Sequence, residues 1–415
     1  EVVLVRDEIK LAEQEAKATL FEWPDGDGKI HKFGVIDLPL FYTDTEKGAG
    51  GKSPTADVRK LVGQLKNEGV EGLIIDLRRN GGGGLDEAIT LTGLFIDRGP
   101  VVQVKDSEGN LRVFEDEEKG AFYDGPMVVL CSHISASASE IFCAALQDYK
   151  RALIVGEKST FGKGTVQAVI GLGRWYPQTY VPPAESGALK MTVQKFYRVA
   201  GGSTQLQGVI PDISIPSVYD YMDIAERSLD NCLSFDEIAP VEFQPSGLIT
   251  PELVRELSSR SARRVAASRD FAYVLEDIEI QKKLMSDKSI SLNEKERIRE
   301  KEMNEKRAED RRKERLARQS PRPRALILTV DNPVPHEAPK PEKSGEEPGQ
   351  EPGAGDKLPL PGDDGPDEPE TSGTEEPGVD PVLDEGLNLL NDLVELTKKE
   401  PTPRQISVGG APPRP

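Results

Sequence analysis

The chain has 415 residues and a formal net charge of −19, a length that suits two or three domains. Nucleic-acid phosphates would be repelled by so acidic a protein, so the charge argues against nucleic-acid binding. Every apolar run is too short to cross a bilayer, so no transmembrane segment is predicted. The chain opens at Glu1 without an initiator Met, and we interpret it as a fragment of a longer protein.

The first part of the chain alternates between strand and helix patterns. Residues 1–22 are predicted to form a strand and a polar connector, and residues 32–42 a buried strand. Apolar residues at helical spacing predict a helix over 55–68. Residues 72–77 are almost continuously apolar, as in a parallel strand covered on both faces. This alternation predicts an α/β domain.

A run of four glycines, 81–84, follows that strand and precedes a predicted helix over 85–96. Glycine permits positive φ and close approach of the backbone to a ligand, and successive N–H groups in such a turn can bind an anion. We interpret the run as one half of an oxyanion hole, and a plain flexible turn is the alternative. A hairpin is then predicted over 101–114.

The stretch 131–167 carries the predicted chemistry. An apolar strand leads through alternating Ser and Ala into a helix that begins at about Ser137. A serine at a strand-to-helix turn lies beside the free N–H groups of the helix N-terminus, which suits a nucleophile with part of an oxyanion hole. A second strand, 152–155, leads to a glycine-rich turn in which Gly162 and Gly164 flank Lys163.

The serine needs a base, and the chain has only three histidines, of which only His133 lies near Ser137 in sequence. A Ser–His–Asp triad is therefore poorly supported. Lys163 can act as the base if burial lowers the pKa of its amine. The alternative is a solvated lysine in a hairpin turn. A phosphate-binding loop is disfavoured, because five residues rather than four separate Gly156 from the Gly-Lys pair.

Two acidic residues lie on the helix that Ser137 opens. Glu140 falls in its first turn, where a carboxylate complements the helix dipole, and Asp148 falls near its end. We favour structural roles for both, and orientation of a catalytic group is the alternative. The three cysteines, Cys131, Cys143 and Cys232, lack metal-ligand spacing and are predicted to be buried free thiols.

Four ordered blocks resemble the tail-specific proteases, the C-terminal processing serine peptidases with a Ser/Lys dyad. They are SASASEIFCAALQDY and VGEKSTFGKGTVQ around Ser137 and Lys163, GLIIDLRRNGGGGLDEA upstream, and VQKFYRVAGGSTQLQGVIPDI downstream. The resemblance covers most of residues 1–235. One departure is GEKSTFGKG, which carries an extra residue before the lysine turn relative to the commoner form.

The resemblance implies the roles of the site residues. Ser137 is the nucleophile, Lys163 the base and Gln167 the residue that supports the lysine. The N–H groups of Gly83 and Ala138 are the oxyanion-hole donors, with Glu140 and Asp148 as possible supporting residues. Neither a metal nor a cofactor is implied.

The resemblance also implies a domain plan. Residues 1–30 are the end of a truncated PDZ-type domain and a connector, and residues 31–235 a crotonase/ClpP-like spiral protease core. Residues 236–325 form a charged C-terminal helical region. Residues 326–415 form a Pro/Gly/Glu-rich disordered tail with a short helix at 381–398.

The expected function is a serine endopeptidase that cleaves polypeptides near accessible, apolar C-termini through an acyl-enzyme. An adaptor protein is a possible partner, and the expected location is the periplasm or cell envelope. A non-catalytic peptide-binding protein on the same fold and an acyl-CoA enzyme of crotonase type are the alternatives. Neither alternative requires both Ser137 and Lys163.

Overall fold

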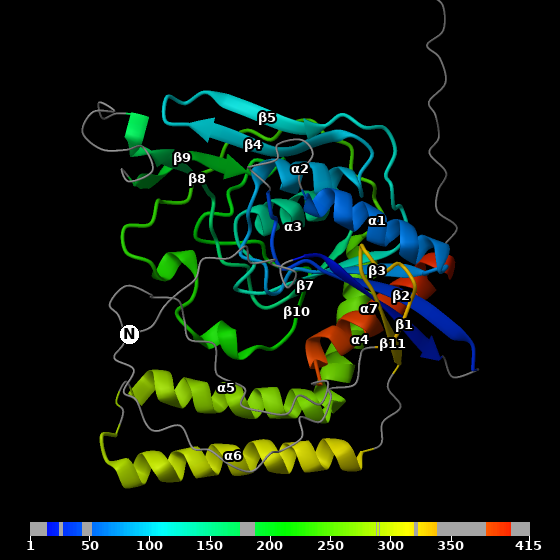
Figure 1. Ribbon diagram of the computed structural model, residues 1–415, viewed down its shortest axis with the longest axis vertical. Helices are drawn as coiled ribbons and strands as arrows, with labels where there is room; N and C mark the ends of the chain where they lie inside the picture. The colour runs from blue at the N-terminus through cyan, green and yellow to red at the C-terminus, as the bar shows by residue number, and fades with distance from the viewer. Residues whose placement is uncertain are drawn as a thin grey trace, which may run out of the picture.

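A computed structural model describes residues 15–24, 28–43, 52–174, 187–287, 289, 291–318, 323–337 and 379–399 (Figure 1). The described strands are β1 Lys17–Pro24, β2 Ile30–Asp37, β3 Gly72–Asp76, β4 Gly99–Asp106, β5 Leu111–Asp116, β6 Met127–Cys131, β7 Leu153–Gly156, β8 Thr165–Gly171, β9 Ala188–Tyr197, β10 Ile213–Ser214 and β11 Arg324–Leu328. The described α-helices are α1 Pro54–Asn67, α2 Leu85–Gly93, α3 Ala138–Asp148, α4 Pro251–Ala267, α5 Arg269–Asp287, α6 Glu294–Ala317 and α7 Pro381–Lys399. The expectation for residues 1–14 lies outside the described residues.

The central sheet has seven strands in the order β10-β7-β6-β3-β2-β1-β11. The five strands from β10 to β2 are parallel, and β1 and β11 continue the sheet in antiparallel pairing. Strands β6 and β7 are buried along their whole length, as the continuous apolar runs predict for parallel strands covered on both faces. The mixed α/β class predicted from the strand and helix alternation is confirmed.

Helices cover both faces of this sheet (Figure 1). Helices α1, α2 and α3 pack on one face, around Leu61, Leu91 and Phe142. Helices α4 and α7 pack on the other, where α7 contacts the central strands β3 and β6. Ser53 caps α1 by accepting a hydrogen bond from the Ala56 N–H. The carboxyl ends of β3, β6 and β7 therefore emerge between two apolar layers.

A second sheet has four antiparallel strands in the order β5-β4-β9-β8. The hairpin of β4 and β5 matches the one expected over 101–114. Phe196 and Val104 face the core, and Gln103 and Lys195 belong to the opposite face by strand alternation. Strand β8 begins two residues after Lys163, so this sheet carries the lysine turn.

The last described helix, α7, is part of the core although it lies far along the chain from its partners. Leu390 is fully buried, and a Cβ atom at Gly72 on β3 would lie 2.7 Å from its side chain. Asp380, just before α7, accepts two hydrogen bonds from Arg78, at 2.8 and 2.6 Å. Arg78 also binds Asp76, so one guanidinium joins β3 to the start of α7. A short helix is predicted at 381–398, and α7 occupies these residues as a docked element.

The pairing of two strands bears on the expected domain plan, which stays a prediction. Strand β1 pairs with β2 over its whole length, so residues 17–24, within the range expected to hold the end of a PDZ-type domain and a connector, belong to the central sheet. Strand β11 pairs with β1, so the ordered part of the chain continues beyond residue 326. Backbone pairing with strands distant in sequence decides both points, and local composition carries no sign of it.

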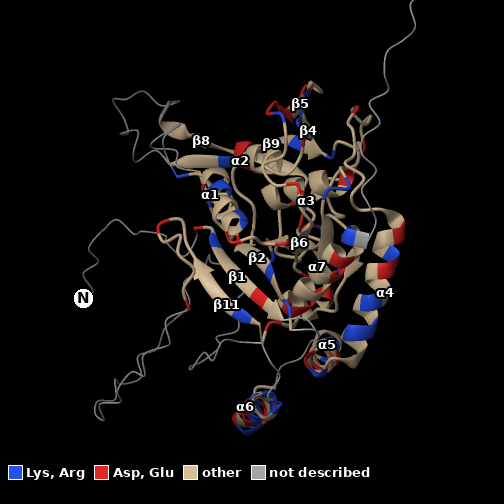
Figure 2. Cartoon of the chain, turned by 90° about the vertical axis from the view of Figure 1, so that its right-hand side faces the viewer, with Lys and Arg blue, Asp and Glu red and all other residues tan. Residues whose placement is uncertain are grey.

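Helices α5 and α6 lie side by side and away from the central sheet (Figure 2). Tyr273 on α5 donates a hydrogen bond to Glu314 on α6, and Arg311 on α6 pairs with Asp277 on α5. Helix α6 has no buried residue, and Lys, Arg, Asp and Glu surround it. The solvated, charged helix predicted from interleaved Glu, Lys and Arg is found here. None of the helices in the described ranges has an apolar stretch long enough to span a membrane.

We predict that Leu390→Ala lowers the free energy of unfolding by about 2–5 kcal/mol, because it leaves a cavity between α7 and β3. Leu292→Ala is the matched control, since the Leu292 side chain is 98% exposed. That change should cost about 0.5 kcal/mol or less. Denaturant titration of both variants tests this, and equal stabilities would show that α7 is not part of the folded core.

Candidate active site

Ser137 lies immediately before α3, at the end of the turn that leaves β6. The Ser132 hydroxyl donates to the carbonyl oxygen of Arg78 at 2.5 Å, and the Ser135 hydroxyl donates to that of Leu77 at 2.7 Å. These bonds tie the turn to the end of β3. Ser137 has φ 56° and ψ −110°, a backbone conformation that L-residues rarely adopt. Such strain costs about 1–3 kcal/mol and tends to occur at functional sites.

The glycine run lies against this turn because Asn80 joins the two segments. Asn80 is fully buried, and its side chain accepts from the Gly82 N–H at 2.8 Å and donates to the Leu38 carbonyl oxygen at 2.8 Å. Its own carbonyl oxygen accepts from the Ala136 N–H and from the Ser139 hydroxyl. Asn80 thereby holds the glycine run against the N-terminus of α3.

Glycine is required at Gly82 and Gly83, which have φ of 106° and 141°. A Cβ atom at Gly83 would lie 2.0 Å from the carbonyl oxygen of Phe41. One at Gly82 would lie 2.9 Å from the Cβ of Ser137 and 3.2 Å from the Ala138 nitrogen. The loop therefore touches the residues on which the nucleophile and the second donor are expected.

The two expected oxyanion donors lie at this contact. The loop uses the N–H groups of Gly82 and Gly84 in hydrogen bonds to Asn80 and Phe41. This leaves the Gly83 N–H without a partner among the described residues. Ala138 is the first residue of α3, where N–H groups have no partner within the helix. The structure thus places Gly82, the residue before Gly83, against Ser137 and the Ala138 nitrogen.

The lysine turn is held on one side by residues 203–208. The Thr204 hydroxyl donates to the carbonyl oxygen of Lys163 at 3.0 Å, and Gln205 accepts from the Gly164 N–H at 2.8 Å. The Leu206 N–H donates to the carbonyl oxygen of Gly162 at 2.7 Å. Gly162 has φ 95° and lies so close to residues 206–208 that a side chain would be crowded.

The carboxylate of Glu140 holds the turn on the other side and joins it to the serine. One oxygen accepts from the N–H groups of Ser137 and Lys163, at 2.8 and 2.9 Å. The other accepts from the Gly162 N–H and the Thr160 hydroxyl, at 2.7 and 2.6 Å. Glu140 is fully buried, and burial raises its pKa to about 7 although these four hydrogen bonds act to lower it. Glu140 is expected to have a structural role at the N-terminus of the helix. In the structure it also joins the Ser137 turn to the Lys163 turn.

The Lys163 side chain is half-buried, and its amine donates to Gln167 Oε1 at 3.3 Å. No hydrogen bond joins this amine directly to the Ser137 hydroxyl. Burial lowers the pKa of the Lys163 amine, and the nearby positive charge of Lys190 lowers it further. Glu226 and Glu140 oppose that shift. Such a shift favours the neutral amine that a base requires.

His133, the alternative base, is engaged elsewhere. Its ring is buried, and its Nε2 lies 3.0 Å from Asp220 Oδ1. Its backbone N–H donates to Glu157 at 2.5 Å. The described contacts of His133 therefore lead toward residues 157 and 220, and none of its hydrogen bonds reaches Ser137.

Asp148 lies away from Ser137, in the structural position that the sequence analysis favours for it. It ends α3, about 16 Å along the helix from Ser137 at 1.5 Å per residue. Its carboxylate is buried against Arg198, with an N–O distance of 2.5 Å. Asp148 instead joins α3 to the end of β9 through this ion pair.

Sequence reasoning missed the residues that position the site, chiefly Asn80, Thr160 and Gln205. Asn80 directly precedes the glycine run, and that placement is the one available signal. Gln205 offered none, since its partner Gly164 is 41 residues away. Within the described ranges, no group of His, Cys, Asp and Glu is arranged to bind a metal.

The chain resembles known proteins over both its halves. Residues 32–215 match peptidase family S41, and residues 219–395 match the C-terminal domain of tail specific protease. The Tail-specific protease of Haemophilus influenzae is 40% identical over 340 residues, covering 81% of this chain and 46% of the relative. The Carboxy-terminal-processing protease of Bartonella bacilliformis is 37% identical over 174 residues, covering 41% of this chain and 37% of the relative.

Among solved structures, the photosystem II D1 C-terminal processing protease aligns with a TM-score of 0.38 and 30% identity, covering 48% of each chain. The chain spans less than half the length of the two curated relatives. The two matched segments extend without a large gap from β2 into α7 and include Ser137, Lys163 and the glycine run. On this evidence the chain belongs to the tail-specific protease family within peptidase family S41.

Proposed function

We propose that this chain is a serine endopeptidase that hydrolyses peptide bonds near the C-termini of polypeptides. The observation that carries the proposal is the single Glu140 oxygen that binds the N–H groups of both Ser137 and Lys163. It holds a strained serine next to a half-buried lysine whose pKa is lowered. Family membership and the names of the relatives support the same activity.

In the proposed reaction, neutral Lys163 removes the proton of the Ser137 hydroxyl as its oxygen attacks the scissile carbonyl carbon. Gln167 Oε1 accepts an N–H of the amine, which leaves the nitrogen lone pair available to the serine. The N–H groups of Gly83 and Ala138 stabilise the oxyanion. The C–N bond then breaks, the leaving amine takes the proton from Lys163, and water hydrolyses the acyl-enzyme with Lys163 again as base.

A second candidate is a non-catalytic peptide-binding protein on the same fold. It is favoured by one observation, that the Lys163 amine binds Gln167 and not Ser137. We prefer the enzyme because peptide binding requires neither the strained Ser137 backbone nor a lysine of lowered pKa. Catalytic hydrogen bonds also often form only once substrate is bound.

The finer expectations from the resemblance belong to the same proposal. They are a crotonase/ClpP-like spiral core, substrates with accessible apolar C-termini, an adaptor protein and a location in the periplasm or cell envelope. The expected division into a protease core up to about residue 235 and a helical region beyond it also remains a proposal. It is supported by the change of family match between residues 215 and 219.

We predict that Ser137→Ala and Lys163→Ala each abolish cleavage of a peptide substrate while the free energy of unfolding changes little. The two residues act as a unit, so the double variant should lose no more activity than either single one. Lys119→Ala, in an exposed loop, is the control and should keep full activity. Full activity of Lys163→Ala, or strong inhibition of the wild type by a metal chelator, would contradict the dyad.

We predict that kcat/KM rises with pH along one basic limb that reports Lys163. The amine must be neutral, so activity is low below its pKa and reaches a plateau above it. An ordinary lysine titrates near ~10.4, and burial here places the limb lower. The measurement is a pH profile on one peptide.

Three variants identify the group that titrates. Lys190→Gln removes a positive charge and should move the limb to higher pH, and Glu226→Gln removes a negative charge and should move it to lower pH. His133→Ala should leave the limb in place. A limb near ~6.5 that disappears in His133→Ala would make histidine the base.

We predict that Glu140→Gln lowers kcat by about 10- to 100-fold, because its amide nitrogen cannot accept the hydrogen bonds of the carboxylate. The carboxyl pKa is about 7 in the folded state and near ~4.3 in the unfolded chain. Folding therefore takes up a proton between these values. The unfolding free energy of the wild type should fall, relative to Glu140→Gln, as the pH rises through this window.

Denaturant titrations at pH 5.5 and 7.5 measure that difference. Glu118→Gln, which removes an exposed carboxylate, serves as the control. A difference in unfolding free energy between wild type and Glu140→Gln that stays the same from pH 5.5 to 7.5 would show that the folded-state pKa is not raised.

A further inference from the structure

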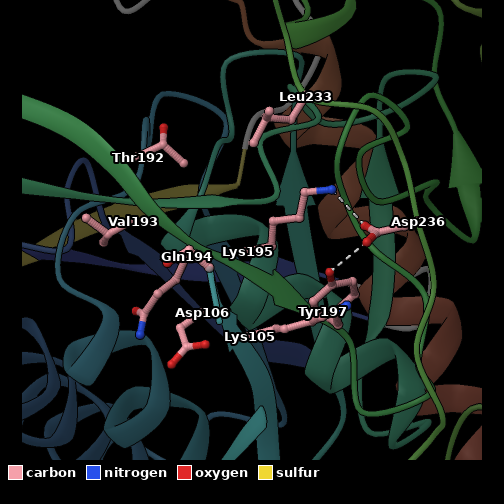
Figure 3. Close-up of a pocket in the computed structure, with 10 residues that line it drawn as sticks. Lys105, Asp106, Thr192, Val193, Gln194, Lys195, Tyr197, Leu233 and Asp236 are labelled. Atoms are coloured by element: carbon pink, nitrogen blue, oxygen red, sulfur yellow. Dashed lines mark hydrogen bonds and ion pairs between the residues drawn. The ribbon is translucent and has the colours of Figure 1, made fainter. Parts of the chain in front are cut away.

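A cavity of about 320 Å³ lies on the four-stranded sheet (Figure 3). Strands β4 and β9 form its floor, and residues 233–236 cross above it. The side chains used in the argument are those of Lys105, Thr192, Lys195, Tyr197, Leu233 and Asp236. None of these residues has a role in the reaction proposed above.

The cavity is continuous with the candidate active site through strand pairing. Thr192 on β9 lies directly opposite Gln167 on β8, the residue that binds the Lys163 amine. Lys195 lies opposite Thr165, and Lys105 on β4 lies opposite Lys195. Opposed residues of an antiparallel sheet share a face, and Thr165 and Gln167 share one by alternation. The floor of the cavity is thus the same sheet face that presents Gln167.

Two lysines, Lys105 and Lys195, and two aspartates, Asp106 and Asp236, line the cavity, and one of the lysines has no direct partner. Lys195 and Tyr197 both donate to Asp236, each at 3.0 Å (Figure 3). Asp106 accepts hydrogen bonds from the backbone and side chain of Asn110 in the β4–β5 turn. The Lys105 amine makes no hydrogen bond or ion pair with any residue that the structure describes, and its positive charge helps to lower the pKa of the nearby Asp236 carboxyl. Lys105 therefore offers donors to a ligand, and Leu233 lies across the cavity from the sheet.

We propose that this cavity is a substrate subsite in which Lys105 binds a carboxylate of the polypeptide being cleaved. The inference rests on the proposed peptidase function. A carboxylate suits a single ammonium that has no direct partner, whereas Asp106 and Asp236 in the wall would repel a doubly charged group such as a phosphate more strongly. The carboxylate is either an acidic side chain or the C-terminal carboxylate.

The sheet geometry sets the distance of that carboxylate from the scissile bond. Lys105 lies two strands from β8, about 10 Å across the sheet at ~4.8 Å per strand. An extended peptide advances about 3.3 Å per residue. The carboxylate should therefore lie about three or four residues from the scissile bond.

The test compares four peptides that are otherwise identical. The third and fourth residues after the cleaved bond are both Glu or both Gln, and each of these two peptides has either a free or an amidated C-terminus. For wild type and Lys105→Gln, kcat and KM are measured on each. We expect the loss of the relevant carboxylate to lower kcat/KM of the wild type about ten-fold, mainly through KM. On the peptide that carries the carboxylate, Lys105→Gln should lower kcat/KM by the same factor. On the peptide that lacks it, the kcat/KM of Lys105→Gln should equal that of the wild type. Lys105→Arg should restore the preference, and Lys119→Gln should behave as wild type.

The outcome also separates the two carboxylate sources. Sensitivity to amidation alone identifies the C-terminal carboxylate, and sensitivity to Glu→Gln alone identifies a side chain. A wild type without preference, or a Lys105→Gln variant that keeps it, would overturn the subsite. If the chain cleaves none of the peptides, the proposed activity is wrong. The subsite is then tested by the binding of the same peptides to Ser137→Ala, measured by fluorescence anisotropy. Equal affinity for acidic and neutral peptides would then overturn it.

Discussion

The candidate site depends on one buried carboxylate. Glu140 accepts four hydrogen bonds, and its donors come from two segments that only the fold brings together, the start of α3 and the turn 160–163. A fully buried carboxylate is costly unless such donors surround it, and its raised pKa shows that the cost is only partly offset. Because its partners are mostly backbone N–H groups, Glu140 sets the course of the chain at Ser137 and Lys163 without binding either side chain.

The remaining parts of the site are supported by the two-sided core. Asn80 and the serines at 132 and 135 tie the glycine run and the nucleophile turn to the end of β3. On the far face of the sheet, α7 packs on β3, and Asp380 binds Arg78 just before the glycine run. The glycine run is therefore held from the helix side and from the α7 side. A helix near the end of the chain thus contributes to the rigidity of a site made of residues 80–167.

The second sheet carries both the lysine turn of the candidate site and the cavity of the proposed subsite. Gln167 and Thr192 oppose each other on β8 and β9, so a peptide lying along this face would meet the lysine turn and the Lys105 cavity in succession. Asp236 braces the cavity through Lys195 and Tyr197, which keeps the crossing segment 233–236 over the sheet. The proposed reaction and the proposed recognition would thus share one antiparallel sheet, and a site built on rigid elements favours precise placement of a substrate.

Local sequence was enough to predict most of the elements and to select the candidate site residues. Apolar runs identified β3, β6 and β7, the strand-to-helix change identified Ser137, and flanking glycines singled out the Lys163 turn, with ordered motifs assigning Gln167, Gly83 and Ala138. Tertiary structure alone decided which acid of α3 serves the site, since Glu140 meets the lysine turn and Asp148 meets Arg198. It also decided that β1, β11 and α7 belong to the core, through partners such as Arg78 and Asp380, 302 residues apart. The physical reason is range: periodicity and turn chemistry act over a few neighbouring residues, whereas burial, pKa and ion pairing depend on whatever the folded chain brings within a few ångströms.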